Sequence, residues 1–128
     1  GAKIKPVIPC YILKSNQTLL KLSSLDFSFI VEKNISEIFE LLHKYQMKVD
    51  MIQNSAISFS VCINNKYSRL DDLIKKLTNK FKVEVNDNVD LYTIRHFTQE
   101  SIDKIKKDGK KILLEQRANQ VVQFVTIN

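Results

Sequence analysis

Two features of the sequence have the clearest capacity for chemistry: a predicted helix start at Asn34 and an acidic residue, Asp50, in a predicted strand. The first turn of a helix has unpaired backbone N–H groups and the positive end of the helix dipole, and both favour a bound carboxylate. Asp50 could bind an ammonium group, since a carboxylate in an apolar strand is costly to bury without a partner. We expect the beginning of this strand to lie beside the helix start. The two features together would then bind a zwitterion, such as a free amino acid.

The sequence lacks the residue patterns of common catalytic centres. Glycine occurs only at Gly1 and Gly109, so a glycine-rich phosphate-binding loop cannot form. His43 and His96 are isolated, and no serine stands in a nucleophile motif, so we interpret both histidines as solvated or hydrogen-bonded structural residues. We therefore predict no catalytic residue, no metal site and no cofactor in this chain.

The two cysteines, Cys10 and Cys62, are far apart in the sequence and have no Cys or His neighbour at metal-ligand spacing. Each lies in an apolar, strand-like run. We expect both to be buried, reduced thiols.

The composition indicates an ordered globular chain, because 44% of its 128 residues are hydrophobic and 27% are charged. No apolar run is long enough to cross a bilayer, and the N-terminus lacks the pattern of a secretion signal. We expect a cytoplasmic protein with no membrane partner. The chain begins with Gly1 rather than Met, which suggests that it is a piece of a longer protein.

The formal net charge is +6, and much of the excess comes from five lysines around Gly109. They are Lys104, Lys106, Lys107, Lys110 and Lys111. Cations favour the C-terminal end of a helix, so we interpret this cluster as a solvated helix end. We predict no nucleic-acid partner.

Residues 18–85 show the hydrophobic patterns of four strands and two helices. Apolar residues at spacings of three and four predict a helix that opens at Asn34, whose side chain caps the first turn while Glu37 completes a capping box. A second helix is expected to open with Ser68 and Asp71. Strands are predicted at residues 18–22, 49–53, 57–63 and 82–85. This order is typical of an α+β, ferredoxin-like βαββαβ module, with an antiparallel sheet and helices on one face.

Residues 91–127 repeat the beginning of this pattern and then stop. A strand is predicted at 91–97, a helix from Thr98 with Ile102 and Ile105 inward, and strands at 112–115 and 121–127. The missing last helix and strand would leave an open sheet edge. A strand at 7–13, restricted to an edge by Pro9, could cover it. We therefore predict that the first module is inserted into a second, shortened one.

Several stretches carry a pattern that extends over nearly the whole chain. They are residues 16–25 (NQTLLKLSSL), 38–42 (IFELL), 49–55 (VDMIQNS), 57–61 (ISFSV), 91–96 (LYTIRH) and 113–117 (LLEQR). This pattern resembles the C-terminal regulatory region of aspartate kinases, and it is most similar to the lysine-sensitive monofunctional type.

The resemblance implies tandem ACT modules. The first would be residues 16–88, inserted into an incomplete second module made of residues 1–15 and 89–128. In this family a preceding kinase domain, which would hold ATP and Mg²⁺, transfers the γ-phosphate of ATP to aspartate in lysine, threonine and methionine biosynthesis. We expect that domain to be absent here, so that this fragment is not itself an enzyme. The implied partners are a free amino acid effector, the kinase domain of the same chain and a second copy, in a homodimer formed by ACT–ACT pairing.

The resemblance also implies an effector site at the interface between two first modules. Its residues are Phe27, Ser28 and Ile30 in a loop, Asn34 and Ile35 at the helix start, Val49 and Asp50 in a strand, and Asn54 and Ser55 in a turn. The helix start would bind the ligand carboxylate, the strand would bind its ammonium group, and the turn could come from the partner subunit. Phe27 and Phe29 could instead be core residues, and Ser55 could simply shape a turn.

Two positions depart from the family pattern. The glycine that usually precedes the helix is replaced here by Lys33 or Asn34. Lysine-sensitive members often have Glu where this chain has Ala56, so a candidate partner for a lysine side chain is missing. We expect lysine as the favoured effector and threonine next.

Two other functions fit part of the sequence. The chain could be an ACT module used only for dimerisation, or a basic ferredoxin-like RNA-binding domain. An RNA-binding domain would expose aromatic residues on its central strands. Residues 57–63 are instead expected to expose Ser58, Ser60 and Cys62.

Overall fold

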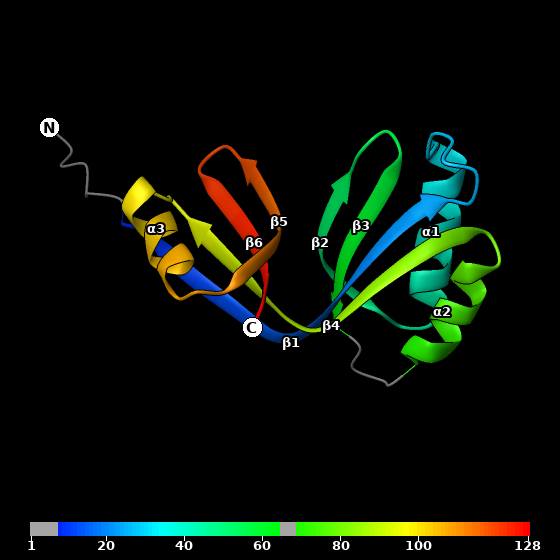
Figure 1. Cartoon of the computed structure of the whole chain (residues 1–128), viewed down its shortest axis with the longest axis horizontal. Coiled ribbons are helices and arrows are strands. Elements are labelled where there is room, and N and C mark those ends of the chain that lie inside the picture. The colour runs from blue at the N-terminus through cyan, green and yellow to red at the C-terminus, as the bar shows by residue number, and fades with distance from the viewer. Residues whose placement is uncertain (1–7, 65–68) are drawn as a thin grey trace, which may run out of the picture. The chain divides into compact units, whose positions relative to one another are not determined.

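The computed structural model describes residues 8–64 and 69–128, which form six strands and three helices (Figure 1). In chain order these elements are β1 (Cys10–Ser24), α1 (Glu32–Lys44), β2 (Lys48–Asn54), β3 (Ser58–Asn64), α2 (Leu70–Thr78), β4 (Phe81–Arg95), α3 (Gln99–Lys107), β5 (Lys111–Ala118) and β6 (Val121–Ile127). The strand order is β2-β3-β1-β4-β6-β5, with antiparallel pairing of β3 to β1 and β2 and of β6 to β4 and β5. The predicted α+β class is confirmed.

The chain divides into two compact units. One, here called the inserted unit, is Asn16–Asn88, and the other, the flanking unit, is Val89–Asn128 together with the described residues before Asn16. Both units share the long strands β1 and β4. The assignment of these units to two ACT modules remains a prediction.

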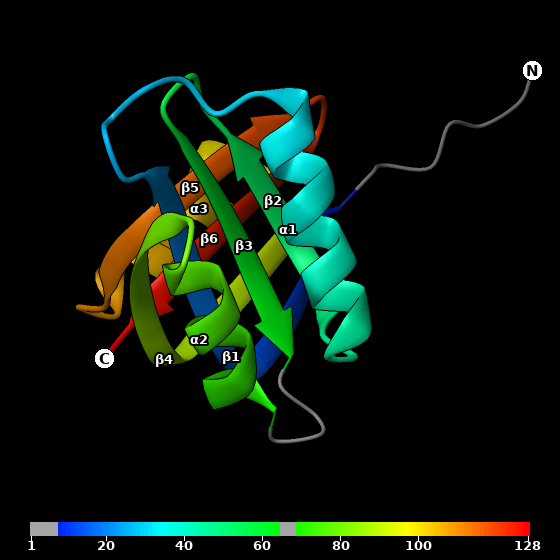
Figure 2. The ribbon, with the colours of Figure 1, turned by 90° about the vertical axis from the view of Figure 1, so that its right-hand side faces the viewer.

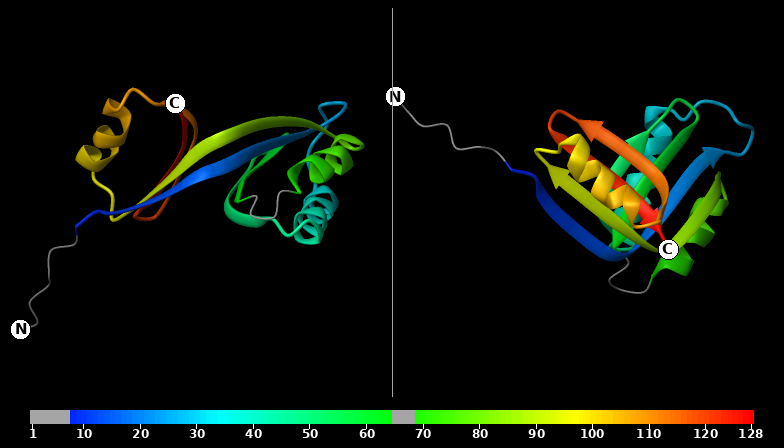
Figure 3. Two further views of the ribbon diagram at one scale, coloured as in Figure 1. Left: turned by 90° about the horizontal axis from the view of Figure 1, so that it is seen from below. Right: turned by 60° about the vertical axis from the view of Figure 1, so that its left-hand side comes forward.

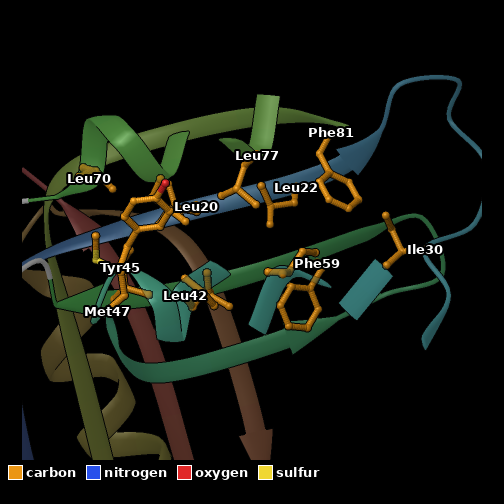
Figure 4. Packing of buried hydrophobic residues seen from close by; sticks show 14 residues of the cluster. Leu20, Leu22, Ile30, Leu42, Tyr45, Met47, Phe59, Leu70, Leu77 and Phe81 are labelled. Atoms are coloured by element: carbon orange, nitrogen blue, oxygen red, sulfur yellow. The ribbon is translucent and has the colours of Figure 1, made fainter. Parts of the chain in front are cut away.

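The inserted unit has both of its helices, α1 and α2, on one face of its strands (Figure 2). Apolar residues at helical spacing, such as Ile38 and Leu42 of α1, face this sheet and are almost fully buried. Figure 4 shows the side chains of this core between strands and helices. Its fully buried members include Leu20, Leu22, Ile38, Val61, Ile63, Leu73 and Leu77. The ferredoxin-like arrangement expected from the sequence is therefore observed.

The flanking unit packs α3 on a smaller core. The helix predicted from Thr98 is observed, and Thr98 caps it: its hydroxyl accepts the Ser101 backbone N–H at 3.1 Å and its own N–H donates to the Ser101 hydroxyl at 2.8 Å. Ile102 and Ile105 are buried, as expected, against Val122 and Phe124 of β6. Among the described residues of the flanking unit, α3 is the helix that covers this core.

β1 and β4 are single strands of 15 residues each, whereas the sequence predicted two short strands in each place (Figure 3). The predicted breaks fall on polar residues that include Asn16 and Asn88, and both adopt left-handed backbone conformations, with φ of 55° and 54°. Asparagine tolerates this conformation better than most residues, so the strands continue through it. The predicted breaks were wrong for this reason, and Val7, the start of the first predicted strand, lies outside the described residues.

The alternation of core residues in β4 changes at the left-handed Asn88. Before Asn88, the odd-numbered Phe81 and Val83 pack in the core of the inserted unit. After it, the even-numbered Tyr92 and Ile94 pack in the core with α3. The residues of β4 that pack in the helix-covered cores are thus odd-numbered before Asn88 and even-numbered after it, and the odd-numbered Val89 and Leu91 are buried as well.

The two helix starts of the inserted unit differ from prediction. α1 begins at Glu32, and Asn34 is its third residue rather than its cap; the Asn34 side-chain oxygen accepts the Val31 backbone N–H at 3.0 Å. Glu37 does not complete a capping box, because it is one turn too far along and pairs with Lys80 at 3.3 Å. α2 begins at Leu70, and the predicted opening residue Ser68 lies outside the described residues.

β3 is buried on both faces, contrary to the expected exposed face with Ser60 and Cys62. Both of these side chains are buried. Cys62 stands opposite Leu19 of β1 and Met51 of β2, which are buried as well. Neighbouring strands thus make this face apolar, which the alternation of one strand could not reveal. Of the two expectations for Cys62, burial of its thiol is confirmed and exposure on a polar strand face was wrong. Cys10 is exposed, so the expectation that its thiol is buried was wrong.

The lysine cluster around Gly109 is only partly a solvated helix end. Lys106 pairs with Glu115 at 3.8 Å, and Lys110 pairs with Asp90 at 3.6 Å. Lys110 also donates a hydrogen bond to the Tyr92 hydroxyl, and this bond raises the pKa of the lysine. The Lys110 contacts anchor the turn between α3 and β5 to β4, and the Lys106 pair joins α3 to β5.

Candidate functional site

The predicted site residues fall into two groups at opposite ends of β2. β1 and β2 both pair antiparallel with β3, so they run in the same direction. The registers place Asn54 level with Leu22 near the end of β1, and Val49 level with Thr18. Asp50 therefore lies about 13 Å along the strand from Asn54, at about 3.3 Å per residue.

The start of α1 lies near the Asn54 end of β2. The Ile30 backbone N–H donates to the Ala56 carbonyl at 2.9 Å, which ties the segment before α1 to the turn after β2. α1 then runs back along the sheet, and its end leads into the beginning of β2. The expectation that Asp50 and the Asn34 helix start are neighbours within one chain was wrong, because the end of α1, rather than its start, precedes this strand.

The loop before α1 is shaped by its own polar side chains. The Ser28 backbone N–H donates to the Asp26 carboxylate at 3.1 Å, and the Ser24 hydroxyl donates to the Ser28 carbonyl at 2.8 Å. Hydrogen bonds from Ser28 lower the pKa of Asp26, so this carboxylate stays charged at neutral pH. Phe27 adopts a left-handed conformation, with φ of 60°, within this turn.

The helix start offers backbone N–H groups that a carboxylate could bind. Valine at the capping position Val31 has no side-chain acceptor for the N–H groups of the first turn. The Asn34 side chain is used differently, as it accepts from the Val31 N–H. Ile35 is half-buried and packs against the core, which anchors this turn to the sheet. The Asn34 side chain thus stabilises the first turn, and carboxylate binding at this helix start remains a prediction.

Large apolar side chains are exposed around this helix start. They are Leu25, Phe27, Phe29, Val31 and Ile57, and each exposes more than half of its surface. The alternative that Phe27 and Phe29 belong to the core is wrong, since they are 71% and 70% exposed. The Lys82 ammonium lies 5.8 Å from the centre of the Phe27 ring. Exposed apolar groups gathered in this way typically mark an interaction surface.

Asp50 occupies a β-bulge. Val49 is opposite Ile63 and Met51 is opposite Cys62, so Asp50 is an additional residue in β2 without a counterpart in β3. A bulge redirects a side chain relative to the regular alternation of the strand. Asp50 is half-buried, and β2 has β3 on one side only in the strand order. The bulge carries no sequence signal that we recognised.

Ser55 shapes the turn between β2 and β3. Its hydroxyl accepts the Ser58 N–H at 3.1 Å, and its own N–H donates to the Ser58 carbonyl at 2.9 Å. Asn54, the last residue of β2, is exposed beside this turn. The structure therefore brings Asn54 and Ser55 together with the loop and the helix start, and leaves Val49 and Asp50 at the other end.

The strand and helix order of the inserted unit, with helices on one face of an antiparallel sheet, defines a ferredoxin-like module. No protein-family model matches the sequence, and no curated protein matches it. Among solved structures, the fold is shared by regulatory regions of aspartate kinases.

Three of these structures come from different bacteria. A domain described as the C-terminal regulatory domain of an aspartate kinase from Porphyromonas gingivalis W83 has a TM-score of 0.73 at 21% identity, over 92% of this chain and 85% of that one. Aspartokinase III of E. coli in complex with lysine and aspartate has a TM-score of 0.69 at 20% identity, over 94% of this chain and 31% of that one. The regulatory subunit of aspartate kinase from Thermus flavus has a TM-score of 0.66 at 13% identity, over 91% and 86%. At these identities the likeness establishes the fold.

No helix within residues 8–64 and 69–128 combines the length and the apolar character that a membrane crossing requires.

Proposed function

We propose that this chain is the regulatory region of an aspartate kinase, and that it binds a free amino acid, with lysine favoured and threonine next. The fold that it shares with such regions supports this proposal, as do the sequence stretches that resemble them. The kinase domain, with its ATP and Mg²⁺, would lie elsewhere in the parent protein, so that this region regulates rather than catalyses.

The arrangement of the site residues supports a binding site shared between two copies. β2 is at the end of the strand order, and the helix start and Asp50 lie at its two ends. If two β2 strands pair antiparallel about a two-fold axis, the beginning of each strand comes beside the end of the other. Asp50 of one copy then approaches the helix start of the second copy, which compensates for the separation of about 13 Å within one chain. This opposed placement is the observation on which the proposal rests.

Each half of the shared site would bind one end of the ligand. The first-turn N–H groups of α1 bind the carboxylate, and Asp50 of the other copy binds the ammonium group. The exposed loop with Phe27 and the turn with Asn54 would surround the ligand side chain. Binding that favours one arrangement of the two copies would bias an attached kinase domain, provided that the ligand prefers that arrangement.

Calorimetric titration with lysine, threonine and methionine tests the proposal, with the dimer verified by light scattering. We expect lysine or threonine to bind with measurable heat. The Asp50→Ala substitution should weaken this binding by about 1.5–3 kcal/mol. A dimer that gives no heat with any of the three would leave only the dimerisation function. Unchanged affinity in the Asp50 variant would reject its role at the ammonium group.

A further inference from the structure

A cavity lies on the helical face of the inserted unit, between α1 and α2. Its volume is about 250 Å³, and none of the predicted effector-site residues lines it. Glu37, Glu40 and Leu41 line it from α1, and Lys76, Lys80 and Phe81 line it from the end of α2 and the start of β4. The cavity belongs entirely to the inserted unit.

The two walls of this cavity carry opposite charges. Two carboxylates stand on the α1 side and two ammonium groups on the α2 side. Glu37 and Lys80 neutralise each other at 3.3 Å. Glu40 and Lys76 are exposed, and the described part of the chain gives neither an ion-pair partner. One negative and one positive group thus remain available on opposite sides of the same cavity.

Apolar side chains form the base between these walls. Phe81 is 3% exposed and belongs to the core, and Leu41 is half-buried against the same core. Both are held by packing, so the base is preformed and does not have to be ordered on binding. An apolar side chain placed on this base would lose part of its contact with water.

We propose that this cavity binds a second free amino acid, one with an apolar side chain of about the size of leucine. Lys76 binds its carboxylate, Glu40 binds its ammonium group, and Leu41 and Phe81 contact its side chain. A free amino acid carries an ammonium and a carboxylate group on the same carbon atom, and the interior of a peptide does not, so the paired charges favour a free amino acid over a peptide segment. This site is independent of the shared effector site.

The probe is L-leucine, titrated into the ¹⁵N-labelled chain and followed by amide chemical shifts. We expect saturable shifts around Glu40, Lys76 and Phe81. Two analogues separate the charges: 4-methylpentanoate lacks the ammonium group, and 3-methylbutylamine lacks the carboxylate. Each analogue should bind at least about tenfold more weakly, because it leaves one wall charge without a partner.

Matched variants identify the residues that bind. Glu40→Gln and Lys76→Met should each weaken leucine binding about tenfold. Lys75→Met is the control, because Lys75 is exposed on α2 but does not line the cavity. Leucine affinity should be unchanged in this control and in Asp50→Asn, which affects the other site.

Four results would overturn the second site. They are the absence of leucine-induced shifts, binding of either analogue as tight as that of leucine, unchanged leucine affinity in Glu40→Gln or Lys76→Met, and loss of leucine binding in Asp50→Asn. The last result would assign leucine to the shared effector site. A failure of lysine and threonine to bind would reject the proposed regulatory function and leave the leucine result unaffected.

Discussion

Replacement of Asn88 by valine should destabilise the chain, although valine is the more favourable residue in most strands. Asn88 has a φ of 54° inside β4, and a β-branched residue strongly avoids this region. The cost of holding it there is about 1–3 kcal/mol. Relaxing to a regular strand would shift the side-chain alternation between the two halves of β4, of which Tyr92 and Ile94 pack in the core with α3.

Urea unfolding at 25 °C measures this change as the free energy of unfolding. Glu84→Val is the matched control, since Glu84 is exposed in the same strand and is not among the residues with positive φ. It should change the free energy by less than about 0.5 kcal/mol. Asn88→Gly should be tolerated better than valine, because glycine adopts positive φ without strain. Equal stability of the two valine variants would refute the role of the left-handed residue.

Three further predictions follow from burial, capping and charge. Phe59→Ala should lower the free energy of unfolding by about 3–5 kcal/mol, since Phe59 is 2% exposed. Phe29 is 70% exposed, so Phe29→Ala should change this free energy by less than about 0.5 kcal/mol. Similar changes in the two variants would contradict the assignment of Phe59 to the core and Phe29 to the surface. Thr98→Ala should cost about 1 kcal/mol in urea unfolding through loss of the α3 cap, and no change would show that the cap is dispensable. The pKa of Asp26, measured by NMR of its carboxyl carbon, should lie below the ordinary value of 3.8. The charged Asp26 therefore stabilises the loop above pH 3.8, and this stabilisation is lost as the pH falls through the lower folded-state pKa. Ser28→Ala should return the pKa toward its ordinary value, and an unshifted pKa in the native chain would argue against the turn.

Hydrophobic periodicity predicted most of the fold. The stripe that includes Ile38 and Leu42 identified α1, and Thr98 with inward Ile102 identified α3, because these signals are local. The strand breaks were mispredicted, since the polar residues at Asn16 and Asn88 indicate turns as readily as left-handed residues within a strand. The burial of Cys62 depends on Leu19 and Met51 of neighbouring strands, which a pattern within one strand does not contain.

The candidate site was predictable only in its parts. The loop and the turn of the first group are neighbours because one βαβ unit brings them together, as the bond from Ile30 to Ala56 shows. The position of Asp50 depends on the direction in which α1 returns along the sheet and on a bulge, and neither is visible in residue types. The sequence indicated the two charged halves of a zwitterion site, but it did not indicate that one chain holds them apart.

Complementation between two variants tests the shared site most directly. Asn34→Asp places a negative charge at the helix start, where it repels the ligand carboxylate while remaining compatible with the helix. Asp50→Asn removes the charge that would bind the ammonium group. Each variant alone should lose lysine or threonine binding.

After the two variants are unfolded together and refolded as an equal mixture, half of the dimers should combine one of each. In such a dimer one site carries both defects and the other carries neither, so calorimetry should recover about a quarter of the native binding stoichiometry. If the mixture binds no better than either variant alone, while the native chain binds, then the effector site does not join Asp50 of one copy to the helix start of the other.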